Sequence, residues 1–185
     1  MRVIGGEFRS RRLIAPASTS VRPTTDRVRE AIFDILFSLG GVDGLLVADL
    51  FAGSGAMGIE ALSRGAASVT FVDRDPVAVD AVRHNLAAVG LDDAERTGDA
   101  TVVRADVDSW VTSTASRFDL VLCDPPYGYQ GWETLMAQLP ADLAVLESGV
   151  EITVPKGWGV IKSKRYGGTI VTVARPERVT QKGVS

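Results

Sequence analysis

The residues with the clearest chemical potential form one run, Asp124-Pro125-Pro126-Tyr127, directly after an apolar segment. Two consecutive prolines fix the backbone angle φ and remove two N–H donors, so carbonyl oxygens project from a rigid turn. With the Asp124 carboxylate they form a site rich in acceptors, which suits a substrate that presents an amino group. Tyr127 offers a ring on which a planar base can stack, worth about 1–3 kcal/mol. The simpler alternative is a rigid turn at the end of a strand, without chemistry.

An exocyclic base amine is a weak nucleophile, because its lone pair is delocalised into the ring. Acceptors on its N–H groups would hold the nitrogen in line with an activated methyl group and offset the positive charge that develops during attack. Such chemistry needs neither a metal ion nor a covalent intermediate. The base must be unpaired or extruded from its helix to reach the site.

A glycine-rich turn precedes this run. Gly53, Gly55 and Gly58 stand at G-x-G-x-x-G spacing between an apolar segment and a helical pattern. Open α/β sheets bind nucleotides at such turns, where glycine lets the backbone turn tightly and approach the ligand. A purely structural turn is the alternative.

Three aspartates extend the nucleotide hypothesis. Asp73 follows Gly53 by about 20 residues, where a carboxylate can accept both hydroxyls of a ribose. Asp49 lies just before the turn, where it can favour a cationic methionine moiety, and Asp106 can accept from an adenine amino group. Asp73 suits NAD as well as S-adenosyl-L-methionine (SAM), while the other two favour SAM. Each aspartate can also be read as a helix cap or a solvated turn residue.

Short apolar segments alternate with helical patterns along most of the chain. We expect a helix from about Arg27, and strands at 47–52, 68–73, 101–105, 118–124 and 142–148, with helices between them. Residues 159–164 and 169–175 read as a terminal antiparallel hairpin, and residues 2–15 as a short hairpin. This pattern predicts an α/β protein with a doubly wound, Rossmann-like parallel sheet.

Charge is distributed unevenly over the 185 residues. The net charge is −3, which alone argues against a nucleic-acid partner. Residues 1–30, however, carry seven arginines against three acids, for +4, and the remainder carries −7. A basic arm on an acidic body favours a polyanionic partner on one face, although a solvated arginine-rich hairpin explains it equally well.

Several other features exclude function classes. No apolar run is long enough to span a membrane, and no leader pattern opens the sequence. The single cysteine, Cys123, cannot form an internal disulfide, so we expect a cytoplasmic protein. The single histidine, His84, has no partner for a metal site or a catalytic dyad, so no metal is expected. Trp132 can shape a base pocket, whereas Trp110 and Trp158 read as packing residues.

The motifs together resemble a known family. The glycine turn, Asp73 and the Asp-Pro-Pro-Tyr run look like SAM-dependent amino-methyltransferases that act on nucleic acid. The stretches Ile4-Gly5-Gly6, Arg22 to Glu30 (RPTTDRVRE) and Glu60 to Gly65 (EALSRG) make the chain similar to the bacterial 16S rRNA guanine-N2 methyltransferase family (RsmD-like) over essentially its whole length. Met57 departs mildly from the pattern, as does the loop after Tyr127.

The resemblance implies a class I SAM-methyltransferase sheet of seven strands, the last antiparallel, in residues 41–185, with an RNA-engaging hairpin and helix in residues 1–40. It implies methylation of N2 of one guanine in 16S rRNA, at a 966-type site, within a 30S subunit or an assembly intermediate. A monomer is the default. By position, the residues that would contact SAM are Asp49, Phe51, Gly53, Gly55, Asp73 and Asp106. Those that would hold the guanine are Asp124, Pro125, Pro126 and Tyr127. The candidates for RNA contact are Arg9, Arg11, Arg12, Arg22, Arg27 and Arg29, the hairpin arginines being the better phosphate ligands.

Three alternatives remain open at this stage. An adenine-N6 or cytosine-N4 amino-methyltransferase of DNA or RNA would use the same Asp-Pro-Pro-Tyr run, although 185 residues leave little room for a separate DNA-reading domain. An NAD-dependent oxidoreductase would explain the glycine turn and Asp73 but not Asp124 to Tyr127. A catalytically silent RNA-binding module would not need Asp124 or Tyr127.

Overall fold

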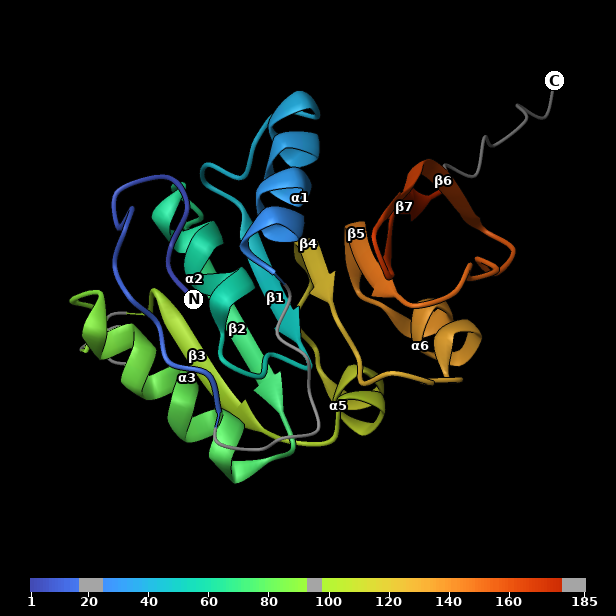
Figure 1. The fold of residues 1–185 in the computed structure, drawn as a ribbon. Helices are drawn as coiled ribbons and strands as arrows, with labels where there is room; N and C mark the ends of the chain where they lie inside the picture. The colour runs from blue at the N-terminus through green and yellow to red at the C-terminus, as the bar shows by residue number, and fades with distance from the viewer. Residues whose placement is uncertain (17–24, 93–97, 178–185) are drawn as a thin grey trace, which may run out of the picture.

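The computed structural model describes residues 1–16, 25–92 and 98–177 and contains one seven-stranded sheet (Figure 1). The strands are β1 (Leu46–Leu50), β2 (Ser68–Asp73), β3 (Ala100–Arg104), β4 (Phe118–Cys123), β5 (Ala141–Ser148), β6 (Trp158–Tyr166) and β7 (Thr169–Pro176), in the order β3-β2-β1-β4-β5-β7-β6. The first five strands are parallel, and β7 is antiparallel to both of its neighbours. This confirms the predicted Rossmann-like class I methyltransferase sheet, its terminal hairpin included.

Helices cover both faces of the sheet because successive strand residues point to opposite sides. The helices are α1 (Asp26–Ser38), α2 (Ala56–Ser63), α3 (Pro76–Ala88), α5 (Val107–Ser113) and α6 (Trp132–Gln138). In β4, Leu120 and Leu122 join an apolar cluster with α1, α2 and α3, whereas Val121 and Cys123 join a second cluster with α5 and α6. The doubly wound arrangement thus follows from strands that are apolar on both faces.

Helix α1 begins where the sequence predicts. The Thr25 hydroxyl accepts a hydrogen bond from the amide of Val28, the usual side-chain cap of a helix N-terminus, and Asp26 stands in the first turn. Its buried stripe, which includes Ile32 and Phe33, packs into the same cluster as α2 and α3. The helix is therefore fixed to the sheet along its length.

The N-terminal segment folds back on itself as the predicted short hairpin: the amides of Val3, Ser10 and Leu13 donate to the carbonyls of Arg11, Val3 and Met1. Residues 2–15 contain one isolated antiparallel bridge, between Arg2 and Arg12, and no strand. The Glu60 carboxylate on α2 also accepts hydrogen bonds from the amides of Ile4 and Gly5, each at 2.8 Å. Gly6 has φ +75°, and a Cβ there would lie 1.7 Å from the Ser63 carbonyl oxygen. The hairpin is therefore held by its own backbone hydrogen bonds and, on the side of α2, by the Glu60 carboxylate.

Among the residues described, no helix combines the length and apolarity that crossing a bilayer requires.

Candidate functional site

The candidate functional residues gather at the carboxyl ends of the parallel strands. Asp49 lies in β1 before the glycine turn, Asp73 ends β2, Asp106 follows β3 and Asp124 follows β4. Because parallel strands end at the same edge of a sheet, residues far apart in the sequence meet there. The structure therefore brings the predicted cofactor and target residues to one edge.

The glycine turn after β1 is held by Asp73. Its Oδ2 accepts the amide of Gly53 and its Oδ1 the amide of Asp75, each at 2.9 Å. Phe51 has φ +58° and Gly55 has φ +72°, so the chain winds through left-handed conformations to enter α2. Each carboxylate oxygen keeps capacity for a further hydrogen bond. Asp73 is thus oriented toward the turn and remains able to accept from a diol.

Asp49 is the buried acid of the site, with 4% of its surface exposed. Its Oδ2 accepts the amide of Gly58 at 2.8 Å. Burial raises the pKa of Asp49 to about 8; the Gly58 hydrogen bond opposes that shift, and the nearby carboxylates of Asp124 and Asp73 add to it. A carboxyl with this pKa loses its proton when a cation binds beside it, because the cation favours the carboxylate.

Asp106 caps helix α5. Its Oδ1 accepts from the amide of Ser109 at 3.1 Å, and its Oδ2 lies 4.0 Å from the Arg74 guanidinium. Capping accounts for an aspartate at this position without a ligand. The side chain remains about half exposed, so it is also accessible from the carboxyl edge of the sheet.

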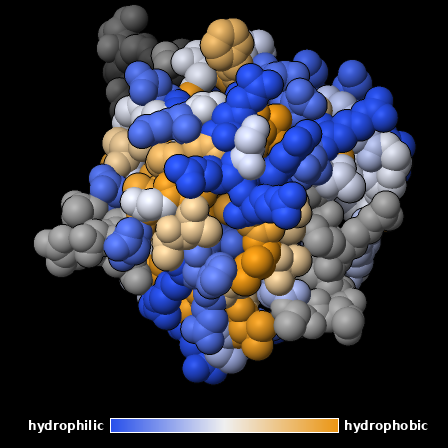
Figure 2. Space-filling view, turned by 60° about the vertical axis from the view of Figure 1, so that its left-hand side comes forward, coloured by the Kyte–Doolittle hydropathy of each residue, from blue (hydrophilic) through white to orange (hydrophobic). Residues whose placement is uncertain are grey.

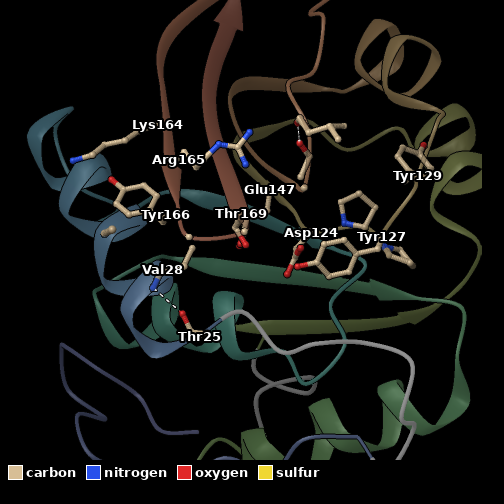
Figure 3. Close-up of a pocket in the computed structure, with 18 of the residues that line it drawn as sticks. Thr25, Val28, Asp124, Tyr127, Tyr129, Glu147, Lys164, Arg165, Tyr166 and Thr169 are labelled. Carbon is tan, nitrogen blue, oxygen red and sulfur yellow. Dashed lines mark hydrogen bonds between the residues drawn. The ribbon is translucent and has the colours of Figure 1, made fainter.

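A cleft of about 980 Å³ opens beside the ends of β4 and β5 (Figure 3). Its floor holds the Asp-Pro-Pro-Tyr run and Glu147, one wall is α1, and the other is the β6–β7 hairpin. The residues that line it from these walls include Thr25, Arg27, Val28, Glu30, Asp34, Lys164, Arg165, Tyr166 and Thr169. Segments from both ends of the chain therefore enclose the predicted target site.

Tyr127 presents its ring to this cleft, with 62% of the residue exposed. A Cβ built on Gly149 would lie 3.1 Å from the ring, so a glycine after β5 leaves the ring its place. The Asp124 amide donates to the Leu50 carbonyl at 3.5 Å, which ties the run to β1. An exposed aromatic ring beside an acid, above a rigid proline turn, suits a stacked planar base.

A second aromatic group connects the cleft with the glycine turn. The Tyr129 ring meets Phe51 and Trp132 edge to face, with centroids 5.4 and 5.3 Å apart. Its hydroxyl donates to the Asp108 carboxylate on α5. The pKa of Tyr129 is raised, mainly by partial burial and secondly by this hydrogen bond. Trp132 is buried and lines the cleft, as predicted, whereas Trp110 packs against Phe118.

The N-terminal arginines take different positions. Arg9, Arg11 and Arg12 are exposed. Figure 2 brings forward the left-hand side of Figure 1, where the N-terminal segment runs, and hydrophilic side chains cover much of the upper part of that view. Arg27 is exposed and lines the cleft. Arg22 and Thr24 fall outside the described residues.

Arg29 is placed differently from the other predicted RNA ligands, because its surface is completely buried. Its guanidinium donates to the Arg2 carbonyl and to Asp26, and its Nε lies 3.6 Å from Glu60. No part of it is accessible to a phosphate in this conformation. Arg29 is therefore corrected from an RNA ligand to an anchor of the N-terminal segment.

Three cleft residues were missed by sequence reasoning. Lys164 and Arg165 belong to a basic run on β6, and Glu147 is an acid near the end of the apolar strand β5. The basic run was a visible signal, but only the folded hairpin shows that it faces the Asp-Pro-Pro-Tyr run. Glu147 has a clearer signal, since an acid inside an apolar strand needs a polar surrounding.

The remaining candidates carry no chemistry. Cys123 is buried in β4, and burial raises the pKa of its thiol well above the ordinary value, so it is not a nucleophile. His84 is exposed on α3. Within the described ranges, no group of three or more histidine, cysteine, aspartate or glutamate residues could hold a metal ion.

Comparison with known proteins agrees with this geometry. The family model described as "Conserved hypothetical protein 95" matches residues 1–175. The chain is 37% identical over 177 residues to ribosomal RNA small subunit methyltransferase D of Escherichia coli K12, covering 90% of this chain and 85% of that protein. It is 38% identical over 186 residues to a Bacillus subtilis protein named as an rRNA methyltransferase, YlbH, covering 94% and 97%. The solved structure named for the Escherichia coli methyltransferase yhhF superposes with a TM-score of 0.80 at 34% identity, covering 96% and 98%. The chain belongs to this family, that of the bacterial ribosomal RNA small subunit methyltransferase D proteins.

Proposed function

We propose that the protein transfers a methyl group from SAM to the exocyclic N2 amine of one guanine in 16S rRNA, at a 966-type site within the 30S subunit or an assembly intermediate. The observation that carries the proposal is the position of Asp124 to Tyr127 on the floor of a large open cleft, one strand away from the acid-lined glycine turn. The relatives named as small-subunit rRNA methyltransferases support the substrate class.

The residues around the glycine turn fit SAM. Asp73 would accept the ribose hydroxyls, Asp106 the adenine amino group, and Asp49 would favour the cationic methionine end. Phe51, Gly53 and Gly55 would lie against the nucleoside. Bound there, SAM supplies a methyl group already activated by a positive sulfur.

The target base would lie on the other side of Asp124. Tyr127 stacks on the base, and the Asp124 carboxylate and the Pro125 carbonyl accept the two N2–H bonds, which localises the lone pair on nitrogen. As the N–C bond forms and the methyl–sulfur bond breaks, positive charge develops on N2 beside Asp124. One proton then leaves N2, and Asp124 is the acceptor at hand. Asp124, Pro125, Pro126 and Tyr127 thus act by positioning and electrostatics.

The RNA strand would leave the cleft across α1. Arg27 and Glu30 line the cleft and also a hollow of about 280 Å³ that Arg2 and Arg9 share. This gives a continuous path from Tyr127 over Arg27 to the exposed N-terminal arginines. Lys164 and Arg165 offer phosphate ligands on the opposite wall.

The deciding experiment is transfer from labelled SAM to 16S rRNA, free and in 30S subunits from a strain that lacks the modification, with the product nucleoside identified. We expect N2-methylguanosine at one position. N6-methyladenosine or N4-methylcytidine would replace the guanine assignment by the second candidate, an adenine or cytosine amino-methyltransferase. Binding of NAD in preference to SAM would overturn the methyltransferase proposal itself.

Replacing Asp49 by asparagine tests its role toward the cofactor. In the free protein a carboxyl with a pKa of about 8 is largely neutral at pH 7, and a cation beside it favours the carboxylate. Binding should therefore release a proton, and affinity should rise with pH up to about 8. We expect Asp49→Asn to weaken SAM binding about tenfold or more and to reduce this proton release. Calorimetry in two buffers of different ionisation enthalpy measures both quantities.

The same variant should bind SAM less tightly but be more stable than the wild type when no ligand is bound. The raised pKa of Asp49 contributes stability that is lost as pH rises from about 4 through 8, so the ligand-free asparagine variant should gain stability relative to the wild type over that interval. Asp80→Asn, an exposed change on α3, is the control. If Asp49→Asn and the wild type released the same number of protons on binding SAM, Asp49 would not be the group that loses a proton to the cofactor site.

Reversing the charges of Arg9, Arg11 and Arg12 to glutamate tests the RNA path. Each lost phosphate contact removes about 0.7–0.9 from the slope of log affinity against log salt. We expect the triple variant to lower affinity for 30S subunits by about tenfold or more and the slope by about 2. The matched control reverses Arg117, Lys156 and Arg175, which are exposed near the amino ends of the parallel strands. Equal losses in the two variants would mean that the N-terminal arginines are not the contact.

A further inference from the structure

The floor of the cleft holds a second acid beside Asp124. Cys123 of β4 pairs in register with Leu146 of β5, so the residues that follow, Asp124 and Glu147, are neighbours across two parallel strands about 4.8 Å apart. Neighbours in register point to the same face, here the face that α1 covers. Figure 3 shows Glu147 and Asp124 between Thr169 and the ring of Tyr127.

Glu147 occupies a place where strand packing favours an apolar residue. Only 3% of its surface is exposed, and its partner in register on β7 is the buried Val171. It nevertheless lines the cleft, with Asp124 on one side and Arg165 of the hairpin among the other lining residues. Its carboxylate has several acceptor positions, so it can accept a hydrogen bond from a base bound in the cleft.

The bases that carry an exocyclic amine differ in the ring nitrogen next to that amine, which is a donor in one base and an acceptor in the others. Guanine presents two kinds of donor side by side on its Watson–Crick edge, the N2 amine and the N1–H. Adenine and cytosine place an acceptor nitrogen beside the amine instead. Two neighbouring carboxylates can therefore both accept from guanine, whereas the second would face a lone pair on adenine or cytosine.

We infer that Glu147 is the residue that selects guanine, by accepting the N1–H while Asp124 accepts from the N2 amine. The inference rests on the proposed function, because it assumes a base held in this cleft. It explains how an Asp-Pro-Pro-Tyr run that suits any exocyclic amine would be restricted to one base. Glu147 is then a specificity-determining residue that contacts the substrate and takes no part in the transfer of the methyl group.

The test replaces Glu147 by glutamine and changes the target base. The modified nucleotide is first mapped with the wild-type protein, and 30S subunits are then reconstituted with guanine or 2-aminopurine at that position. 2-Aminopurine keeps the N2 amine but has an acceptor at N1. We expect the wild type to prefer guanine, and Glu147→Gln to lose about tenfold to hundredfold in kcat/KM on guanine. The same variant should lose little or gain on 2-aminopurine, because its amide can donate to N1.

The ratio between the two substrates separates recognition from a structural role. A variant that is merely less well folded loses equally on both bases, and that result would overturn the inference. Glu147→Asp, which keeps the charge, should retain the preference for guanine, and Glu151→Gln, an exposed change outside the cleft, should match the wild type. If the wild-type protein makes no N2-methylguanosine at all, the proposed function fails before Glu147 is tested.

Discussion

Replacing Asp124 by alanine should lower methyl transfer by about a hundredfold to a thousandfold and leave the affinity for SAM nearly unchanged. The carboxylate lies at the junction between the glycine turn and the cleft, where it would hold the target amine and meet the charge that develops on it. Its removal leaves the strands and the proline turn in place. Single-turnover transfer to 30S subunits measures the first quantity and calorimetry the second.

Asp142→Ala is the control for this variant, because Asp142 is an exposed acid near the amino end of β5, paired with Arg117 and remote from the cleft. It should retain full activity. If Asp124→Ala transferred the methyl group as fast as the wild type, the Asp124 carboxylate would have no role in the transfer. A variant that loses SAM binding in parallel with transfer would instead assign Asp124 to the cofactor.

Replacing Glu60 by alanine should lower the free energy of unfolding by about 3–5 kcal/mol. The fully buried carboxylate accepts hydrogen bonds from two amides of the N-terminal segment and from the Nε of Arg64. It also lies 3.6 Å from the Nε of Arg29. Its loss deprives the buried Arg29 guanidinium of its fully buried carboxylate partner and leaves it the partly exposed Asp26, at 2.9 Å. Thermal and urea unfolding of the ligand-free protein measure the change, which corresponds to a fall in Tm of about 6–20 °C.

Two further variants give this prediction its control. Glu133→Ala removes an exposed acid from α6 and should change stability by less than about 0.5 kcal/mol. Adding Arg29→Met to Glu60→Ala removes the buried charge that has lost one of its two carboxylate partners, so the double variant should recover part of the loss. If the two substitutions are simply additive, Glu60 and Arg29 do not act as a pair.

Most of the fold could be predicted from the sequence because its signals are local. Strands such as β1 and β4 are mostly apolar, and their ends are marked by glycines or by Pro125 and Pro126. The cap at Thr25 and the terminal hairpin are similarly readable from neighbouring residues. Where the ends of parallel strands meet follows from topology alone, so Asp49, Asp73 and Asp124 could be brought together before any coordinates.

The position of Arg29 shows the limit of such reasoning. It stands three and four residues before Ile32 and Phe33, on the apolar stripe of α1, which is a signal of burial. An arginine is buried only when a partner accepts its hydrogen bonds, and the partners here include the distant Glu60. Charge counting treated all seven N-terminal arginines alike, although one of them is fully buried.

The walls of the cleft could not be predicted either. Helix α1 and the β6–β7 hairpin are separated by more than a hundred residues, and no local pattern states that both face Tyr127. Glu147 was not singled out, because its neighbour Asp124 is near only through sheet register. Sequence motifs therefore located the proposed target site, whereas the surface that we propose to set its specificity needed the tertiary structure.

The order of the strands also affects how the enzyme matures during its own synthesis. A chain made from its N-terminus presents β1 to β5 and the glycine turn first, but β6 can join the sheet only through β7, which follows it. The wall that carries Lys164 and Arg165 is thus the last part of the cleft to form. In a nascent chain the glycine turn can therefore assemble before the cleft has its second wall.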